Sequence, residues 1–122
     1  MTRVMVVTLE RPHMYFDVDG TLVRPFKSFE EESEATDTDF IIINNTMMKV
    51  NLKVIEDLKM CRTRGHTVVV WSQGGSSWAC TVVQALNLEE FVDIVIAKPS
   101  WYVDDKTPGT ILDDSRYYDG NF

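Results

Sequence analysis

The chain has 122 residues, of which 44% are hydrophobic and 25% charged, and its formal net charge is −7. This length suits a single domain with one core, and no apolar run reaches the roughly 20 residues that span a bilayer. The acidic balance argues against broad binding to nucleic acids or anionic membranes, because no excess of cations is left to neutralise phosphates.

The N-terminal residues and the cysteines carry weaker signals about location. The start of the chain has no long apolar region followed by a small-residue cleavage site, so we expect no signal peptide. Cys61 and Cys80 lack the spacing of metal ligands and are expected to be reduced packing residues. These features favour a cytoplasmic protein.

Strand and turn signals dominate the first part of the chain. Apolar runs rich in β-forming residues predict strands at 4–9 and 14–19, and the second run ends at an acidic pair. Residues 28–39 are polar and strongly acidic, which predicts a solvated loop. Residues 40–50 are predicted to form two short strands joined at Asn44-Asn45, since asparagine tolerates the positive φ of a tight hairpin turn.

A helix signal follows the hairpin. Asn51 is a good N-cap residue, and Gly65 is a natural residue for the end of the helix. Between them, apolar residues recur at the spacing of one buried helix face: Val54, Ile55, Leu58 and Cys61.

The remaining signals alternate between strand and helix. The nearly continuous apolar run at 66–72 is typical of a central strand that is covered on both faces. A helix is predicted from about Ser76, and further strands are predicted at 92–98 and 100–106. The tail, residues 107–122, is expected either to dock loosely or to fray.

Strands that alternate with helices predict an α/β fold with a small, largely parallel sheet and helices on both faces. Function in such sheets gathers at the carboxyl ends of the strands. The polar residues predicted to meet at this edge are Asp17, Asp19, Ser72, Lys98, Asp104 and Asp105.

Carboxylates gathered at one sheet edge favour a Mg²⁺ site, because Mg²⁺ prefers oxygen ligands and a substrate phosphate. One carboxylate of the Asp17–Asp19 pair can attack phosphorus while the other moves protons. Gly20 allows a close backbone approach to an anion. Taken singly, these residues have ordinary structural explanations: a loop or calcium-type turn for the acidic pair, a strand-end cap for Ser72 and a solvated side chain for Lys98.

The motifs together resemble the haloacid dehalogenase (HAD) superfamily in its phosphatase form. "DVDGT" at 17–21 is similar to the first motif of that family, and "VVVWS" at 68–72 is similar to the second. Lys98 in "IAKP" resembles the third motif and "YVDD" at 102–105 the fourth, so the match spans roughly residues 14–106. The resemblance implies a Rossmann-like fold in which residues 22–50 form a small β-hairpin flap, without a large cap domain.

The resemblance also implies roles for individual residues. Asp17 would be the nucleophile that forms an aspartyl-phosphate, and Asp19 the general acid and then the general base. The phosphate would be bound by Gly20, Thr21, Ser72, Gln73 and Lys98. Mg²⁺ would be held by the Asp17 carboxylate, the backbone carbonyl of Asp19 and Asp104, and Asp105 would be a further ligand or orient a metal-bound water.

One departure from the family concerns Lys98. Only three residues separate it from Tyr102, and four residue steps reach at most roughly 14 Å, which leaves no room for the usual crossover helix. Whether Lys98 reaches the site is therefore open at this point.

Four functions remain, the first two of which are phosphatases. The favoured one is a Mg²⁺-dependent phosphomonoesterase acting on a small phosphorylated metabolite, such as a nucleotide or a sugar phosphate. A polynucleotide 3′-phosphatase is disfavoured by the acidic charge. A catalytically silent regulatory or scaffold domain is the alternative, and a phosphate-sensing receiver domain is opposed by the "DxDGT" start.

Overall fold

The computed structural model describes residues 4, 6, 11–36 and 38–122. Its elements, in chain order, are β1 (His13–Asp17), β2 (Val23–Pro25), α1 (Phe29–Ser33), β3 (Phe40–Ile43), β4 (Thr46–Val50), α2 (Leu52–Thr63), β5 (Thr67–Ser72), α3 (Ser76–Ala85), the 3₁₀ turn η1 (Glu89–Phe91), β6 (Ile94–Ala97), α4 (Pro108–Ile111) and the 3₁₀ turn η2 (Asp114–Arg116). In the described part of the chain, no helix is long and apolar enough to cross a membrane.

A three-stranded parallel sheet in the order β1-β5-β6 forms the centre of the fold. Its middle strand, β5, buries Val68, Val69 and Val70 almost completely, as the continuous apolar run predicts. Asp17 lies opposite Trp71, and Ser72 lies opposite Ala97, so the carboxyl ends of the three strands meet at one edge.

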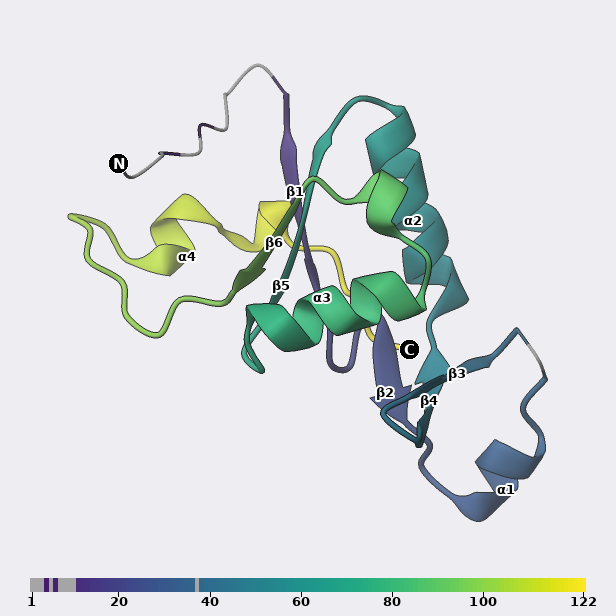
Figure 1. The fold of residues 1–122 in the computed structure, drawn as a ribbon. Coiled ribbons are helices and arrows are strands. Elements are labelled where there is room, and N and C mark those ends of the chain that lie inside the picture. The colour runs from purple at the N-terminus through teal and green to yellow at the C-terminus, as the bar shows by residue number, and fades with distance from the viewer. Residues whose placement is uncertain (1–3, 5, 7–10, 37) are drawn as a thin grey trace.

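The two long helices lie on one face of this sheet. The connections from β1 to β5 and from β5 to β6 step across the sheet in the same direction, and right-handed connections then place both helices on the same side. Figure 1 shows α2 and α3 on one side of the sheet and α4 on the other. The two longer helices therefore share one face, because the three strands never reverse their order across the sheet, and of the helices only the short α4 (Pro108–Ile111) lies on the other side in the described part of the chain.

The predicted flap region forms a second sheet. Its strands run antiparallel in the order β2-β4-β3. The hairpin between β3 and β4 turns at Asn44 and Asn45, which have φ values of 50° and 64°. This confirms the predicted tight turn, since two successive residues with positive φ are what a two-residue hairpin requires.

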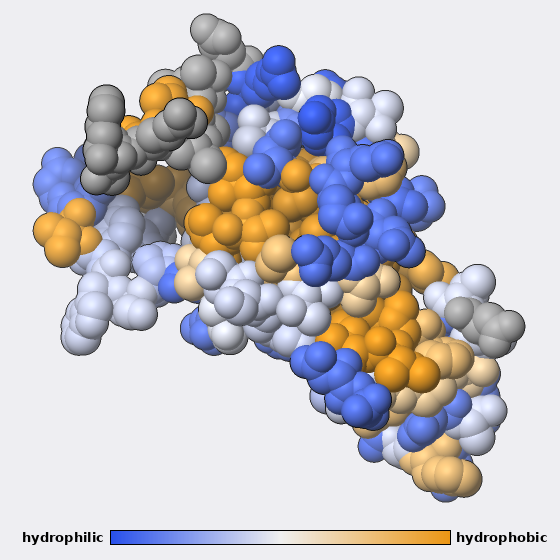
Figure 2. All heavy atoms as spheres, viewed as in Figure 1, coloured by the Kyte–Doolittle hydropathy of each residue, from blue (hydrophilic) through white to orange (hydrophobic). Residues whose placement is uncertain are grey.

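The two sheets share one hydrophobic cluster. It joins Val23, Met48 and Val50 of the antiparallel sheet to Val68 and Val70 of the parallel sheet. Helix α2 contributes Leu58, which is fully buried, along with Val54 and Ile55. Figure 2 shows hydrophobic residues gathered over both sheets, with hydrophilic residues around them.

The predicted helix at 52–63 has the expected start and end. The Asn51 side chain accepts a hydrogen bond from the backbone N–H of Val54, at 3.4 Å. Gly65 follows the helix with φ +86°, a backbone conformation that glycine adopts without a steric penalty.

Three predictions about elements differ from the structure. Residues 28–39 are not entirely loop, because Ser28 caps the short helix α1 by accepting a hydrogen bond from the N–H of Glu31. Residues 100–106 form no strand and lie exposed. The predicted strand at 4–9 falls largely outside the described residues, and Val4 and Val6, which are described, belong to no strand and are exposed.

Candidate functional site

The first part of the candidate site is the turn that follows β1. Val18 and Leu22 are fully buried, and the backbone N–H of Leu22 donates to the carbonyl of Val18 at 2.9 Å. Gly20 has φ +84°, and its N–H donates to the carbonyl of Val23 at 2.8 Å. The apolar residues thus anchor the turn in the core, while Asp17 and Asp19 keep access to solvent at the sheet edge.

Asp17 is the centre of the contacts at this edge. One carboxylate oxygen, Oδ1, lies 3.0 Å from Nζ of Lys98. The other, Oδ2, accepts a hydrogen bond from the Thr21 hydroxyl at 3.2 Å. The side chains of Lys98 and Asp17 are 27% and 32% exposed, so a small anion can reach this pair from solvent.

The backbone after β6 brings Lys98 to the site. Its N–H donates to the carbonyl of Ser72 at 2.9 Å, which extends the pairing between β5 and β6 by one residue. Its ammonium group lies 5.6 Å from the centre of the Trp71 ring, and that ring packs edge-on against Tyr15 at 4.8 Å. The short connection after Lys98 therefore does not keep this lysine from Asp17.

Asp19 is held by a tryptophan from α3. The indole N–H of Trp78 lies 3.1 Å from each carboxylate oxygen of Asp19. Trp78 belongs to the first turn of α3, which follows β5, so the two elements meet at the same sheet edge. Sequence reasoning missed this contact, because spacing gives no signal for a hydrogen bond between residues that are 59 positions apart.

Ser72 lies at the expected edge but beneath the surface. The residue is fully buried, and its hydroxyl oxygen accepts a hydrogen bond from the N–H of Gly74 at 2.9 Å. A Cβ at Gly74 would lie 3.0 Å from the Trp78 ring and 3.3 Å from the Ser72 hydroxyl, so glycine permits this close packing. Gln73, also predicted to bind phosphate, is exposed at the start of the following turn.

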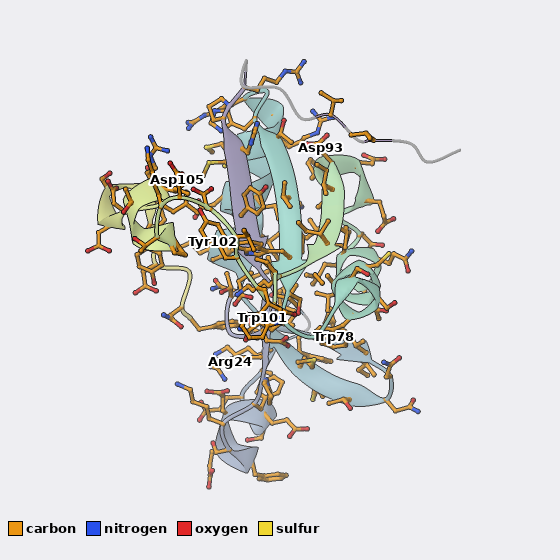
Figure 3. The ribbon with its side chains drawn as sticks, turned by 90° about the vertical axis from the view of Figure 1, so that its left-hand side faces the viewer. Arg24, Trp78, Asp93, Trp101, Tyr102 and Asp105 are labelled. Atoms are coloured by element: carbon orange, nitrogen blue, oxygen red, sulfur yellow. The ribbon has the colours of Figure 1, made fainter. Side chains whose placement is uncertain are left out.

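Asp104 and Asp105 lie apart from the other predicted residues. Both are exposed in the loop after β6, and Figure 3 shows Asp105 beside α4, away from Trp78. A hydrogen bond shared with the Asp105 side chain, and next the N–H of Lys106, hold the pKa of Asp104 below its usual range. The structure brings together Asp17, Thr21 and Lys98, with Asp19 and Ser72 alongside, but not this second acidic pair.

The donor set at the turn fits a divalent cation. Mg²⁺ is usually held by one or two carboxylates, several waters and a substrate phosphate, and does not need a cage made entirely of protein. Asp17 would supply one such carboxylate and the backbone carbonyl of Asp19 a further oxygen ligand, which leaves the Asp19 carboxylate free to move protons. Within the ranges that the structure describes, no three His, Cys, Asp or Glu side chains form a ready-made cluster.

The flap carries its own cluster of charges next to this site. Arg24 binds Glu31 through two hydrogen bonds, at 2.8 and 3.2 Å. This contact first, and then the N–H of Lys27, lower the pKa of Glu31 from its ordinary 4.5 to about 2. The guanidinium of Arg24 is thus already paired with a carboxylate, whereas the side chain of Lys27 remains exposed.

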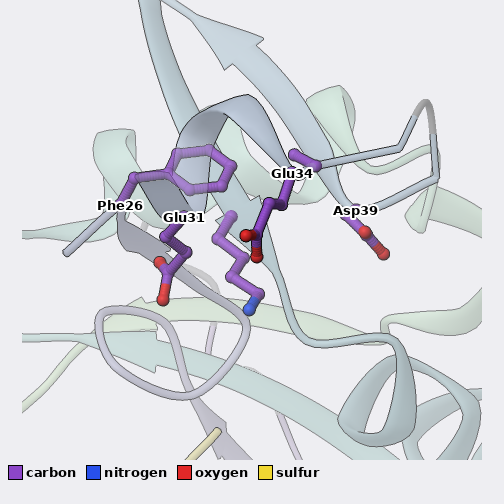
Figure 4. Close-up of a pocket in the computed structure, with 6 residues that line it drawn as sticks. Phe26, Glu31, Glu34 and Asp39 are labelled. Atoms are coloured by element: carbon purple, nitrogen blue, oxygen red, sulfur yellow. The ribbon is translucent and has the colours of Figure 1, made fainter. Parts of the chain in front are cut away.

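A pocket of about 170 Å³ lies within the flap (Figure 4). Its lining contains three carboxylates and one lysine, in the set Phe26, Glu31, Glu34, Ala35, Asp39 and Lys49. It shares no residue with the Asp17 site, and its excess of carboxylates opposes the binding of a phosphate group.

Comparison with known proteins gave no match to a family profile, to a curated protein or to a solved structure.

Proposed function

We propose that the chain is a Mg²⁺-dependent phosphomonoesterase that works through an aspartyl-phosphate and acts on a small phosphorylated metabolite, such as a nucleotide or a sugar phosphate. One observation carries the proposal: the Asp17 carboxylate lies at the carboxyl edge of a parallel sheet, 3.0 Å from Nζ of Lys98 and 3.2 Å from the Thr21 hydroxyl. A nucleophilic carboxylate needs such an arrangement, with a cation beside it and an open approach.

The first step forms a bond between a carboxylate oxygen of Asp17 and phosphorus. The bond between phosphorus and the ester oxygen breaks, and Asp19 gives its proton to the departing oxygen. Lys98, which neutralises Asp17 in the resting site, then shares its charge with the phosphoryl oxygens. Ser72, Gly20, Thr21 and Gln73 are the further proposed phosphate contacts.

The second step returns the enzyme to its starting state. Asp19 takes a proton from water, the water oxygen bonds to phosphorus, and the bond to Asp17 breaks to release inorganic phosphate. The N–H of Trp78 orients Asp19 for both transfers. Mg²⁺ held by Asp17 and Asp19 would supply positive charge that offsets the negative charge gathered as nucleophile meets phosphate.

A metal role for Asp104 and Asp105 requires a change in the loop after β6. Asp17 ends β1, which is an outer strand of the parallel sheet in the described part of the chain and pairs with β5 on one side. Residues 101–105 would have to move towards the end of β1 for Asp104 or Asp105 to reach Asp17. We therefore assign the metal to Asp17 and Asp19. Asp104 and Asp105 would bind it only if the loop after β6 moved towards Asp17.

The test is hydrolysis of a generic aryl phosphate with Mg²⁺ and with a chelator. We expect turnover that requires the metal and that Asp17→Asn abolishes. Asp57→Asn is the matched control, because Asp57 is exposed on α2. Turnover that survives Asp17→Asn would refute Asp17 as the nucleophile.

The second candidate is a regulatory or scaffold domain without turnover. It is favoured by the exposed position of Asp104 and Asp105 and by the burial of the Ser72 hydroxyl, which already accepts a hydrogen bond from Gly74. No hydrolysis across a broad panel of phosphoesters, together with Mg²⁺ binding measured by calorimetry, would support this candidate over the enzyme.

A further inference from the structure

The last four residues, Asp119–Phe122, return to the candidate site from the far end of the chain. We call them the C-terminal clasp. The carbonyl of Gly120 accepts a hydrogen bond at 3.1 Å from the side-chain amide of Asn51, which is 8% exposed and also caps α2. Asp119 accepts hydrogen bonds from the backbone N–H and side-chain amide of Asn121, at 2.9 and 2.7 Å, which fixes the shape of the clasp.

The clasp packs directly on Thr21. A Cβ added at Gly120 would lie only 2.7 Å from the Thr21 methyl carbon, so the backbone of Gly120 touches this methyl group. The hydroxyl on the same Cβ of Thr21 donates to Asp17. Because the two groups share one χ1 rotation, contact with the methyl group fixes where the hydroxyl points.

The clasp also contacts the flap. The Arg24 guanidinium lies 4.8 Å from the centre of the Phe122 ring, and the same guanidinium holds Glu31 of α1. Arg24 belongs to β2, the strand that leads from the Thr21 turn into the flap. The C-terminal clasp therefore contacts three places: Thr21, which donates to Asp17, Asn51 at the start of α2, and Arg24 at the base of the flap.

We propose that the C-terminal clasp is a positioning element, which keeps the Thr21 hydroxyl on Asp17 and holds the base of the flap against the core. None of its groups contacts Asp17 itself, so it acts through Thr21 and Arg24. Its effect on catalysis rests on the proposed function, whereas its effect on the flap does not.

The first test substitutes Gly120→Ala, which forces a methyl group against Thr21. Gly109→Ala is the matched control, because a Cβ at Gly109 meets nothing within 4 Å. We expect Gly120→Ala to speed hydrogen exchange at least tenfold at the N–H groups of Val50 and Asn51, which bond to Asp39 and Leu22 at the flap base. Gly109→Ala should leave exchange at these amides unchanged.

The effect on catalysis is measured by comparing the change in kcat with the change in KM for hydrolysis of an aryl phosphate. Gly120→Ala should lower kcat at least fivefold with a smaller change in KM, since a displaced Thr21 hydroxyl disturbs the nucleophile more than substrate access. Adding Thr21→Ser removes the methyl group that is struck and keeps the hydroxyl, so the double variant should regain part of the lost kcat, but not all of it, because no methyl group then fixes the direction of the hydroxyl.

Phe122→Leu keeps an apolar side chain but removes the aromatic face under Arg24, and it tests the clasp if Gly120→Ala fails to fold. Unchanged flap exchange in both variants would overturn the proposal. Raised exchange with unchanged kcat in an active enzyme would overturn the positioning of Thr21. Raised exchange in a protein that hydrolyses no phosphoester would support the clasp and count against the proposed function alone.

Discussion

At the scale of single residues, the candidate site depends on contacts that join distant parts of the chain. Asp17 meets Lys98 across the sheet edge, and Asp19 meets Trp78 from the start of α3. The two carboxylates thus have different partners, Lys98 and Thr21 for Asp17 and Trp78 for Asp19. This separation supports the proposed division of labour, in which one carboxylate attacks and the other moves the proton.

Trp78→Phe isolates the contribution of the indole N–H to the position of Asp19. The phenyl ring preserves the apolar packing, but the hydrogen bond to the carboxylate is lost. A hydrogen bond to a charged group contributes about 1.5–3 kcal/mol, so we expect kcat to fall by about ten- to hundredfold. Trp101→Phe is the control, because Trp101 is 91% exposed. Equal kcat values for the two variants would exclude Trp78 as a positioning residue.

Lys98→Met removes the charge beside Asp17 and keeps a side chain of similar length. Loss of a preorganised charge at a reacting group typically costs on the order of 100-fold in kcat, and we expect a loss of this size. Lys106→Met, in the exposed loop, should have little effect. Steady-state kinetics on an aryl phosphate measure both, and a Lys98→Met enzyme with normal kcat would show that the ion pair is only structural.

The residues also show what could be predicted from sequence. The position of Asp17 at the end of a strand could be predicted, because the apolar run before it and Gly20 after it determine the strand and the turn through local preferences. The buried state of Ser72 did not follow, because its hydroxyl lies against the following turn, where it accepts a hydrogen bond from the N–H of Gly74. Nor did the Asn51–Gly120 contact, which spans 69 residues and leaves no periodic signal.

At the scale of elements, an ion pair between Arg24 of β2 and Glu31 joins α1 to the sheet of the flap. The low pKa of Glu31, about 2, arises foremost from its hydrogen bonds with Arg24. Since this pKa lies below that of the unfolded chain, the contact stabilises the flap fully above about pH 4.5, and the stabilisation is lost as the pH falls towards about 2.

The matching experiment compares wild-type protein with Glu31→Gln at low ionic strength, where an exposed ion pair is least screened. The difference in flap hydrogen exchange between the two should be largest near neutral pH and should vanish as the pH approaches about 2. Glu32→Gln, on the exposed side of the same helix, is the control. A difference that stays constant with pH would contradict the assigned role of Glu31.

Some elements were predictable and others were not, for a physical reason. Local rules fix the Asn44-Asn45 turn, the Asn51 cap and the central strand β5, and all three are confirmed. The strand predicted at 100–106 is wrong, because an apolar run becomes a strand only when a neighbouring strand pairs with it. Trp101 and Val103 remain almost fully exposed instead.

At the scale of the whole molecule, the flap and the parallel sheet share one core. Met48, in the flap strand β4, is 7% exposed and belongs to the same cluster as Val68 and Val70. Stabilities of small domains amount to about 5–15 kcal/mol in total. Damage to the flap side of this core should therefore destabilise the whole molecule and not the flap alone.

Met48→Ala tests this shared core. We expect the free energy of unfolding to fall by about 2–5 kcal/mol, in one transition that far-ultraviolet and near-ultraviolet signals report together. Met60→Ala, at a site that is 49% exposed, should change it far less. Two separate transitions in urea would show instead that the flap and the sheet unfold independently.

The proposed mechanism as a whole makes one demand, a phosphoryl group bound covalently to Asp17. The direct measurement incubates Asp19→Asn with Mg²⁺ and an aryl phosphate whose phosphoryl group is radiolabelled, followed by acid quenching and peptide mapping. An aryl leaving group departs without a proton donor, so the first step proceeds, whereas water is not activated for the second. We predict label retained on the peptide that contains Asp17, and none in the Asp17→Asn variant. An Asp19→Asn protein without label, from an enzyme whose wild type turns over, would contradict the two-step mechanism.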